Sequence, residues 1–152
     1  MEQSGRAEDA QRLFEQAQVA LDADDTLSAL GILERALKLY DTVGWHSYLG
    51  ACVARERGQF RRGLELCHAS LAAEPDQPAH YLNLGRVHLS NGDKVEALRA
   101  MREGMAKGGN PQLARMLECL GTRRKPVIPA LSRNNPINKY LGILLGRLGI
   151  RR

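Results

Sequence analysis

The chain has 152 residues, a length that suits a single domain and excludes two independent hydrophobic cores. Its content of 43% apolar and 26% charged residues is typical of globular proteins and argues against a wholly disordered or membrane-embedded chain. Leucine and alanine (23 and 18 residues) far outnumber valine, isoleucine and threonine together (14), which favours helices over strands. We therefore expect an all-α fold.

The net charge of +5 is unevenly distributed along the chain. Residues 121–152 hold eight Lys and Arg and no acidic residue, whereas the first 120 residues hold 14 basic and 17 acidic residues. An anionic partner would therefore have to bind the tail. Because Tyr140 is the only aromatic residue in that tail, base stacking has little support and nucleic acid is disfavoured as a partner.

Cysteine usage and the absence of long apolar runs bear on the compartment. The three cysteines form no CxxC pair and are odd in number, which fits a reducing environment without structural disulfides. The first residues are not apolar, and no run approaches the ~18 to 20 apolar residues that a membrane span needs. We expect a cytoplasmic protein, with attachment to a membrane surface as a less favoured alternative.

A shift of 34 residues superposes the landmarks of the sequence on themselves. Small residues recur at two positions twelve apart in each unit, and a turn residue lies between them. The equivalent sets are Ala17, Ala51 and Gly85, then Asp24, Gly58 and Gly92, then Ala29, Gly63 and Ala97. Small side chains let two helices cross closely, and glycine suits the left-handed conformation that ends a helix. Each unit is therefore predicted to be a helical hairpin.

A 34-residue helix-turn-helix with small residues at unit positions 8, 20 and 27 resembles the tetratricopeptide repeat. The resemblance covers residues 7–120, with units at about 10–43, 44–77 and 78–111 and a capping helix at 111–120. It implies an α-solenoid of three hairpins plus a cap, which is close to the minimum that stacks stably. An ordinary helical bundle without repeats is the alternative.

The resemblance also implies that the first helix of each hairpin lines a concave groove, through unit positions 2, 5, 9 and 12. The candidate groove residues are Phe14, Gln18, Trp45, Tyr48, Cys52, Arg55, Leu82, Arg86 and Leu89. Rigid aromatic anchors beside arginines are typical of interaction hot spots, which predicts a protein partner that lays a peptide or helix in the groove. In the alternative interpretation, Trp45 and Tyr48 pack against the preceding unit as part of the core, and the arginines are merely solvated.

Some members of the family clamp the C-terminal carboxylate of heat-shock chaperones with Lys and Asn. Phe14 and Gln18 occupy two of those positions here, so chaperone-tail recognition is not predicted.

Catalytic chemistry finds no support in the sequence. The four histidines have no zinc-ligand spacing to cysteine or carboxylate residues, and no phosphate-binding glycine motif is present. Cys67 and His68 are sequence neighbours, which point about 100° apart on a helix and cannot form a nucleophile and base couple. We expect no enzymatic activity, no cofactor and no metal.

The tail begins with a basic linker containing prolines at 121–135 and continues with a predicted amphipathic helix at 136–149. One face of that helix is apolar and consists of Ile137, Tyr140, Leu141, Leu144 and Leu148. This face could dock on the chain's own repeats, on a partner or a second copy, or on an anionic membrane surface, in decreasing order of preference.

Together these features favour a non-catalytic adaptor or assembly scaffold. One alternative is a chaperone for an aggregation-prone client, since small proteins with three such repeats resemble the chaperones of bacterial secretion translocators. Another is a peripheral membrane or filament-assembly component that acts through the basic tail.

Overall fold

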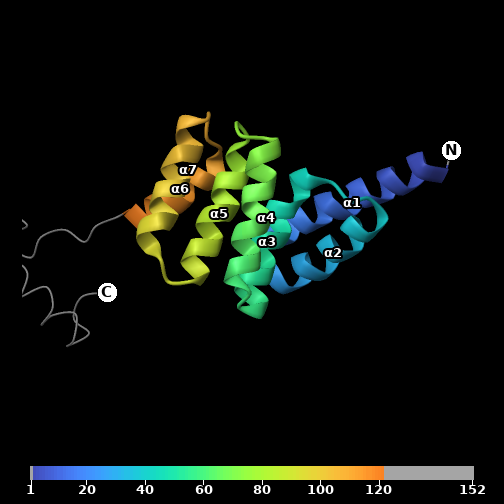
Figure 1. Ribbon diagram of the computed structural model, residues 1–152, viewed down its shortest axis with the longest axis horizontal. Coiled ribbons are helices and arrows are strands. Elements are labelled where there is room, and N and C mark those ends of the chain that lie inside the picture. Colours follow the sequence, from blue (N-terminus) through green and yellow to red (C-terminus); the bar gives the residue numbers. More distant parts are fainter. Residues whose placement is uncertain (1, 122–152) are drawn as a thin grey trace, which may run out of the picture. The chain divides into compact units, whose positions relative to one another are not determined.

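The structure, a computed structural model, describes residues 2–121. These residues form helices and no strand (Figure 1). The helices are α1 (Glu2–Asp22), α2 (Thr26–Leu39), α3 (Val43–Arg57), α4 (Phe60–Ala73), α5 (Pro78–Ser90), α6 (Lys94–Ala106) and α7 (Pro111–Gly121). The all-α prediction is thereby confirmed. The tail helix predicted at 136–149, with its apolar face, lies outside the described residues.

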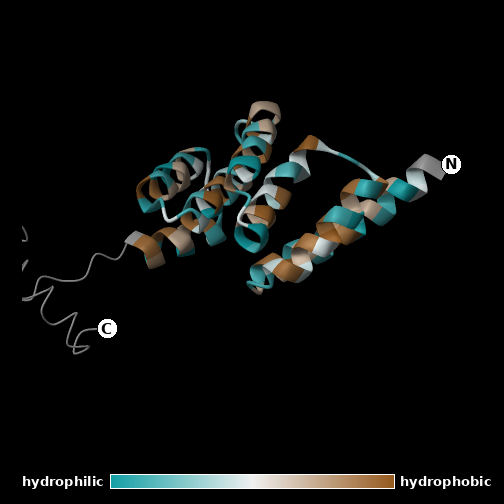
Figure 2. Ribbon diagram, turned by 60° about the horizontal axis from the view of Figure 1, so that its bottom comes forward, coloured by the Kyte–Doolittle hydropathy of each residue, from teal (hydrophilic) through white to brown (hydrophobic). Residues whose placement is uncertain are grey.

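The helices pair in chain order as the repeat predicts. Helices α1 and α2, α3 and α4, and α5 and α6 pack against one another as hairpins, and α3 and α5 also contact the hairpins next to them. The hairpins are stacked in order along the body, with the first turns of α1 projecting beyond α2 (Figure 1). Polar and apolar residues alternate along the helices (Figure 2), as expected when each helix has one buried and one exposed face.

The three predicted turn residues end the first helices. Asp24, Gly58 and Gly92 adopt left-handed backbone conformations, with φ angles of +61°, +64° and +78°. The residues that follow help to start the second helices: the side chains of Asp25 and Asp93 accept hydrogen bonds from backbone N–H groups in the first turns of α2 and α6. Turn chemistry at equivalent positions therefore sets the hairpin geometry.

The closest helix crossing lies in the second hairpin. A Cβ atom added to Gly50 would lie 2.7 Å from the carbonyl oxygen of Gly63, and one added to Gly63 would lie 2.8 Å from the carbonyl oxygen of Gly50. Backbone atoms cannot yield as side chains can, so this crossing requires glycine on both helices. In the third hairpin, Gly85 plays the same part against the side chain of Met101.

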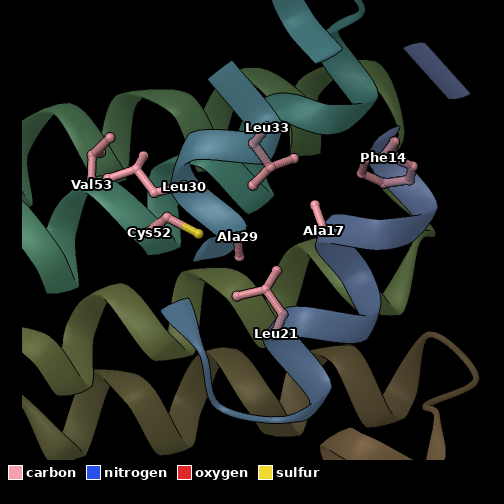
Figure 3. Close-up of a cluster of buried hydrophobic side chains, with 8 residues drawn as sticks. All are labelled: Phe14, Ala17, Leu21, Ala29, Leu30, Leu33, Cys52 and Val53. Carbon is pink, nitrogen blue, oxygen red and sulfur yellow. The ribbon is translucent and has the colours of Figure 1, made fainter. Parts of the chain in front are cut away.

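The core consists of three clusters, each shared by neighbouring helices. The first joins α1, α2 and α3 (Figure 3). The second joins residues of α3 to α6, and the third joins α5, α6 and α7. Leu113 of α7 is completely buried in the third cluster. Helix α7 therefore covers the apolar end of the third hairpin, as a capping helix should.

Candidate functional site

A cavity of about 410 Å³ opens where the three hairpins and α7 converge. Three of the residues that line it, Leu21, Arg55 and Leu89, are repeat equivalents, spaced 34 residues apart on α1, α3 and α5. The other lining residues are Asp24, Thr26, Ala51, Arg86, Ser90 and Met116. The repeat thus brings one unit position from every hairpin to the same site.

Arg55 is held at this cavity by a carboxylate from the preceding hairpin. Its Nη1 and Nη2 atoms donate to the Oδ1 and Oδ2 atoms of Asp24, at 2.5 and 3.0 Å. This two-point ion pair lowers the pKa of Asp24 and raises that of Arg55, chiefly through the hydrogen bonds themselves. The charge of Arg55 is therefore already compensated within the protein.

Arg86 differs from Arg55 in both burial and pairing. Its Nη1 donates to Oδ1 of Asn83 at 3.1 Å, and no carboxylate oxygen of the described residues lies within 4.0 Å of its guanidinium. Burial lowers the pKa of Arg86, while the negative charge of Asp22 acts in the opposite direction. The cavity therefore contains one largely buried arginine without an ion-pair partner in the described chain.

The predicted aromatic anchors form a cluster within the protein. The ring of Phe14 on α1 stacks on Trp45 of α3 with centroids 4.5 Å apart, and it meets Tyr48 edge-on at 5.0 Å. Gln18 donates to the hydroxyl of Tyr48 at 3.3 Å, and burial raises the pKa of that hydroxyl. Phe14 is only 8% exposed, whereas Trp45 and Tyr48 are half-buried. The cluster therefore joins two hairpins, as the core alternative anticipated, and leaves parts of two rings accessible.

Two of the candidate groove residues lie in the core instead. Cys52 is fully buried and Leu82 is 2% exposed, so the expectation that they contact a ligand is corrected. The reason is that the first helix of an inner hairpin uses these positions to pack against its neighbours. Burial also raises the pKa of the Cys52 thiol to about 12. Leu89, by contrast, is half-buried and lines the cavity.

A buried polar network, which the sequence reasoning missed, joins the second and third hairpins. Asn83 Nδ2 donates to Ser47 Oγ at 3.1 Å, so the Ser47 hydroxyl is free to donate to His80 Nδ1 at 2.8 Å. His80 Nε2 then donates to Glu74 at 2.9 Å. The repeat equivalence of His46 and His80 was the one available signal, and Nε2 of His46 likewise lies 2.6 Å from a linker carboxylate.

The order Ser47, His80, Glu74 resembles a nucleophile, a base and an orienting carboxylate. However, Ser47 has no exposed surface and His80 is 1% exposed, so no substrate reaches the hydroxyl in this structure. The network satisfies buried polar groups between two hairpins and is structural.

Comparison with known proteins agrees with the hairpin architecture. Residues 48–111 match the family model described as tetratricopeptide repeat. The chain is a tetratricopeptide repeat protein. A curated relative, a putative pentatricopeptide repeat-containing protein of Arabidopsis thaliana, is 33% identical over 92 residues, which are 56% of this chain and 21% of the relative. The chain thus spans about a fifth of the length of that curated relative.

Three solved structures are similar in fold. The Sgt2 tetratricopeptide repeat domain of Aspergillus fumigatus matches with a TM-score of 0.54 and 16% identity, covering 86% of this chain and 93% of that domain. The first such domain of Spaghetti (RPAP3), bound to an HSP90 peptide, gives 0.53 and 12%, with coverage of 76% and 92%. PcrH of Pseudomonas aeruginosa gives 0.51 and 18%, with coverage of 76% and 93%. At these identities the likeness shows the fold alone.

No helix in the described part of the chain is both long and apolar enough to cross a membrane. Tetratricopeptide repeat domains are typically protein–protein interaction modules and are generally non-catalytic.

Proposed function

We propose that this protein is a non-catalytic adaptor or assembly scaffold that holds a segment of a partner protein at the cavity formed by its three hairpins and α7. The observation that carries the proposal is the convergence of Leu21, Arg55 and Leu89, one equivalent residue from each hairpin, on a single cavity. A site assembled from every repeat is well suited to a ligand that extends along the stack.

The chemistry of the cavity fits a peptide segment. Its volume of about 410 Å³ lies within the range of ligand pockets, and apolar side chains of Leu21, Leu89 and Met116 supply much of its wall. Arg86 adds a buried cation with unused hydrogen-bond donors. The accessible parts of Trp45 and Tyr48 offer a second contact on the same pair of hairpins, α1–α2 and α3–α4.

Site-specific photo-crosslinking in the native cell tests this proposal. A crosslinking residue at Leu89, inside the cavity, should capture a defined partner, whereas one at Val95, which is 75% exposed on α6 and does not line the cavity, should not. Arg86→Gln should weaken the Leu89 crosslink. Equal capture of the same proteins from both positions would mean that the cavity is not the binding site.

The chaperone alternative predicts a different kind of partner. A chaperone should suppress aggregation of an isolated client segment, whereas an adaptor should bridge two folded partners. Light scattering of the crosslinked partner, purified and diluted from denaturant with and without this protein, separates the two functions.

The tail remains a prediction from the sequence, and we propose that its apolar face rather than its charge drives its docking. The basic residues are split between its two ends and form no continuous stripe. Deletion of 122–152 should therefore remove tail-dependent partners whose binding survives added salt. Binding that falls steeply with ionic strength, together with co-sedimentation with anionic liposomes, would favour the peripheral membrane function instead.

A further inference from the structure

Asp24 occupies a backbone conformation that the other two hairpins give to glycine. Its φ angle of +61° matches those of Gly58 and Gly92 at +64° and +78°, and it is the one non-glycine residue in the described chain with a positive φ. Side chains rarely adopt this conformation, although Asp and Asn tolerate it better than most. Because the backbone alone would favour glycine at this turn, the Asp24 side chain needs an explanation.

The side chain of Asp24 reaches across the hairpin boundary to the cavity. It pairs with both terminal nitrogens of Arg55, and its own side chain is 78% exposed. A glycine at this position, as in the sister turns, could not make this contact. The contact therefore distinguishes the turn of the first hairpin, and it occurs at a residue that lines the cavity.

Two arginines and one carboxylate thus face a single cavity with partly apolar walls. Arg55 is occupied by Asp24, while Arg86 has no carboxylate within ion-pair distance in the described chain. The charge of Arg86 also acts on Asp24, although more weakly than that of Arg55. Removal of the Asp24 carboxylate would leave both guanidinium groups available to one anion.

We propose that the cavity is a carboxylate-binding site in which Arg86 holds the ligand and Asp24 is a built-in competitor that occupies Arg55. The ligand class is a peptide that carries a carboxylate beside an apolar side chain, the carboxylate at Arg86 and the apolar group against Leu89 and Met116. This inference rests on the proposed function and specifies its ligand. Asp24 lowers the affinity, and a ligand with a second carboxylate displaces it from Arg55.

Binding of succinate, a dicarboxylate probe that needs no protein partner, tests the site. Its titration is followed by NMR through the Nε–Hε signals of Arg55 and Arg86 in the full chain. The variant Asp24→Asn removes the charge but keeps a residue that tolerates a positive φ. The matched control is Glu34→Gln, because Glu34 forms an ion pair with Arg57 between α2 and α3 at 2.7 Å and does not line the cavity.

We expect succinate to shift the Arg86 signal in the wild-type protein and to bind the Asp24→Asn variant about two- to fivefold more tightly, the range expected from loss of an exposed ion pair. Glu34→Gln should bind as wild type does, and Arg86→Gln should lose binding while retaining its melting temperature. Unchanged or weaker binding by Asp24→Asn, or undiminished binding by Arg86→Gln, would overturn the proposal. Those results would leave the crosslinking test at Leu89 unaffected, so failure of the carboxylate site is distinguishable from failure of the groove.

Discussion

The first and second hairpins share a repeat pattern but use it differently. Val19, Val53 and Val87 are the same residue at the same unit position, yet their exposures are 69%, 1% and 0%. Val53 and Val87 pack in clusters shared with adjoining helices. Among residues 2–121 no hairpin precedes α1, so Val19 remains exposed. Identical residues in a repeat protein can therefore have different energetic roles, depending on their place in the stack.

The outer face of α1 shows the same contrast in its composition. Where α3 has Trp45, Leu49 and Cys52, the equivalent positions of α1 are Gln11, Glu15 and Gln18. Polar residues on the outer face of a terminal repeat keep an otherwise sticky edge in water. The sequence distinguishes the two hairpins by this substitution of polar for apolar residues, while the hairpin landmarks stay constant.

The largest difference between the two hairpins should appear at their helix crossings. Gly50→Ala places a methyl group 2.7 Å from the carbonyl oxygen of Gly63, so α3 and α4 must separate, and we expect a loss of about 3 kcal/mol in the free energy of unfolding, or failure to fold. Gln16 is the exposed repeat equivalent on α1, and Gln16→Ala should change stability by less than about 0.5 kcal/mol. Urea unfolding followed by circular dichroism measures both. Equal effects would show that the second crossing is not special.

A second contrast concerns the polar network, which the first hairpin lacks because its equivalent of Ser47 is Leu13. Ser47→Ala leaves His80 and Asn83 without the hydroxyl to which both are bonded, and we expect it to cost about 2 kcal/mol. The exposed Ser4→Ala is the control, with an expected change near zero. Chemical denaturation of the three proteins gives the comparison. A Ser47→Ala variant as stable as wild type would mean that the network contributes no net stability.

Much of the fold could be predicted from the sequence, because small residues and turn residues act locally. The left-handed turns at Asp24, Gly58 and Gly92 lie where the 34-residue register puts them. The buried small positions Ala17 and Ala29 likewise follow from spacing alone. These features depend on one hairpin at a time, so the repeat pattern suffices to find them.

The site was predictable only in part, because it depends on contacts between hairpins. Position 12 of the register does lead from Arg55 and its equivalents to one cavity, but the register does not show that Cys52 is buried or that Phe14 stacks on Trp45. The ion pair between Asp24 and Arg55 spans 31 residues and depends on how two hairpins pack. Such contacts require the stacked structure.

The valines sharpen the comparison at a smaller scale. Val53→Ala removes two buried methyl groups and should cost about 1 to 2 kcal/mol, since cavities in a packed core are only partly filled by relaxation. Val19→Ala makes the same chemical change at a largely exposed site and should lie within about 0.5 kcal/mol of wild type. Thermal and urea unfolding of the pair measure the difference. If Val19→Ala is equally costly, the outer edge of α1 is covered in solution.

The smallest effect isolates the backbone of the turn from its surroundings. A Cβ atom added to either Gly31 or Gly58 would have no atom within 4 Å, so neither substitution by alanine creates a clash. Gly31 lies within α2, where alanine is the better helix former, and Gly31→Ala should stabilise the protein by about 0.5 to 1 kcal/mol. Gly58 has a φ angle of +64°, and Gly58→Ala should destabilise it by about 1 kcal/mol, because the left-handed region disfavours a Cβ atom. Opposite signs in urea unfolding would show that the turns are specified by backbone conformation; a stabilising Gly58→Ala would show that the turn of the second hairpin can relax to another conformation at no cost.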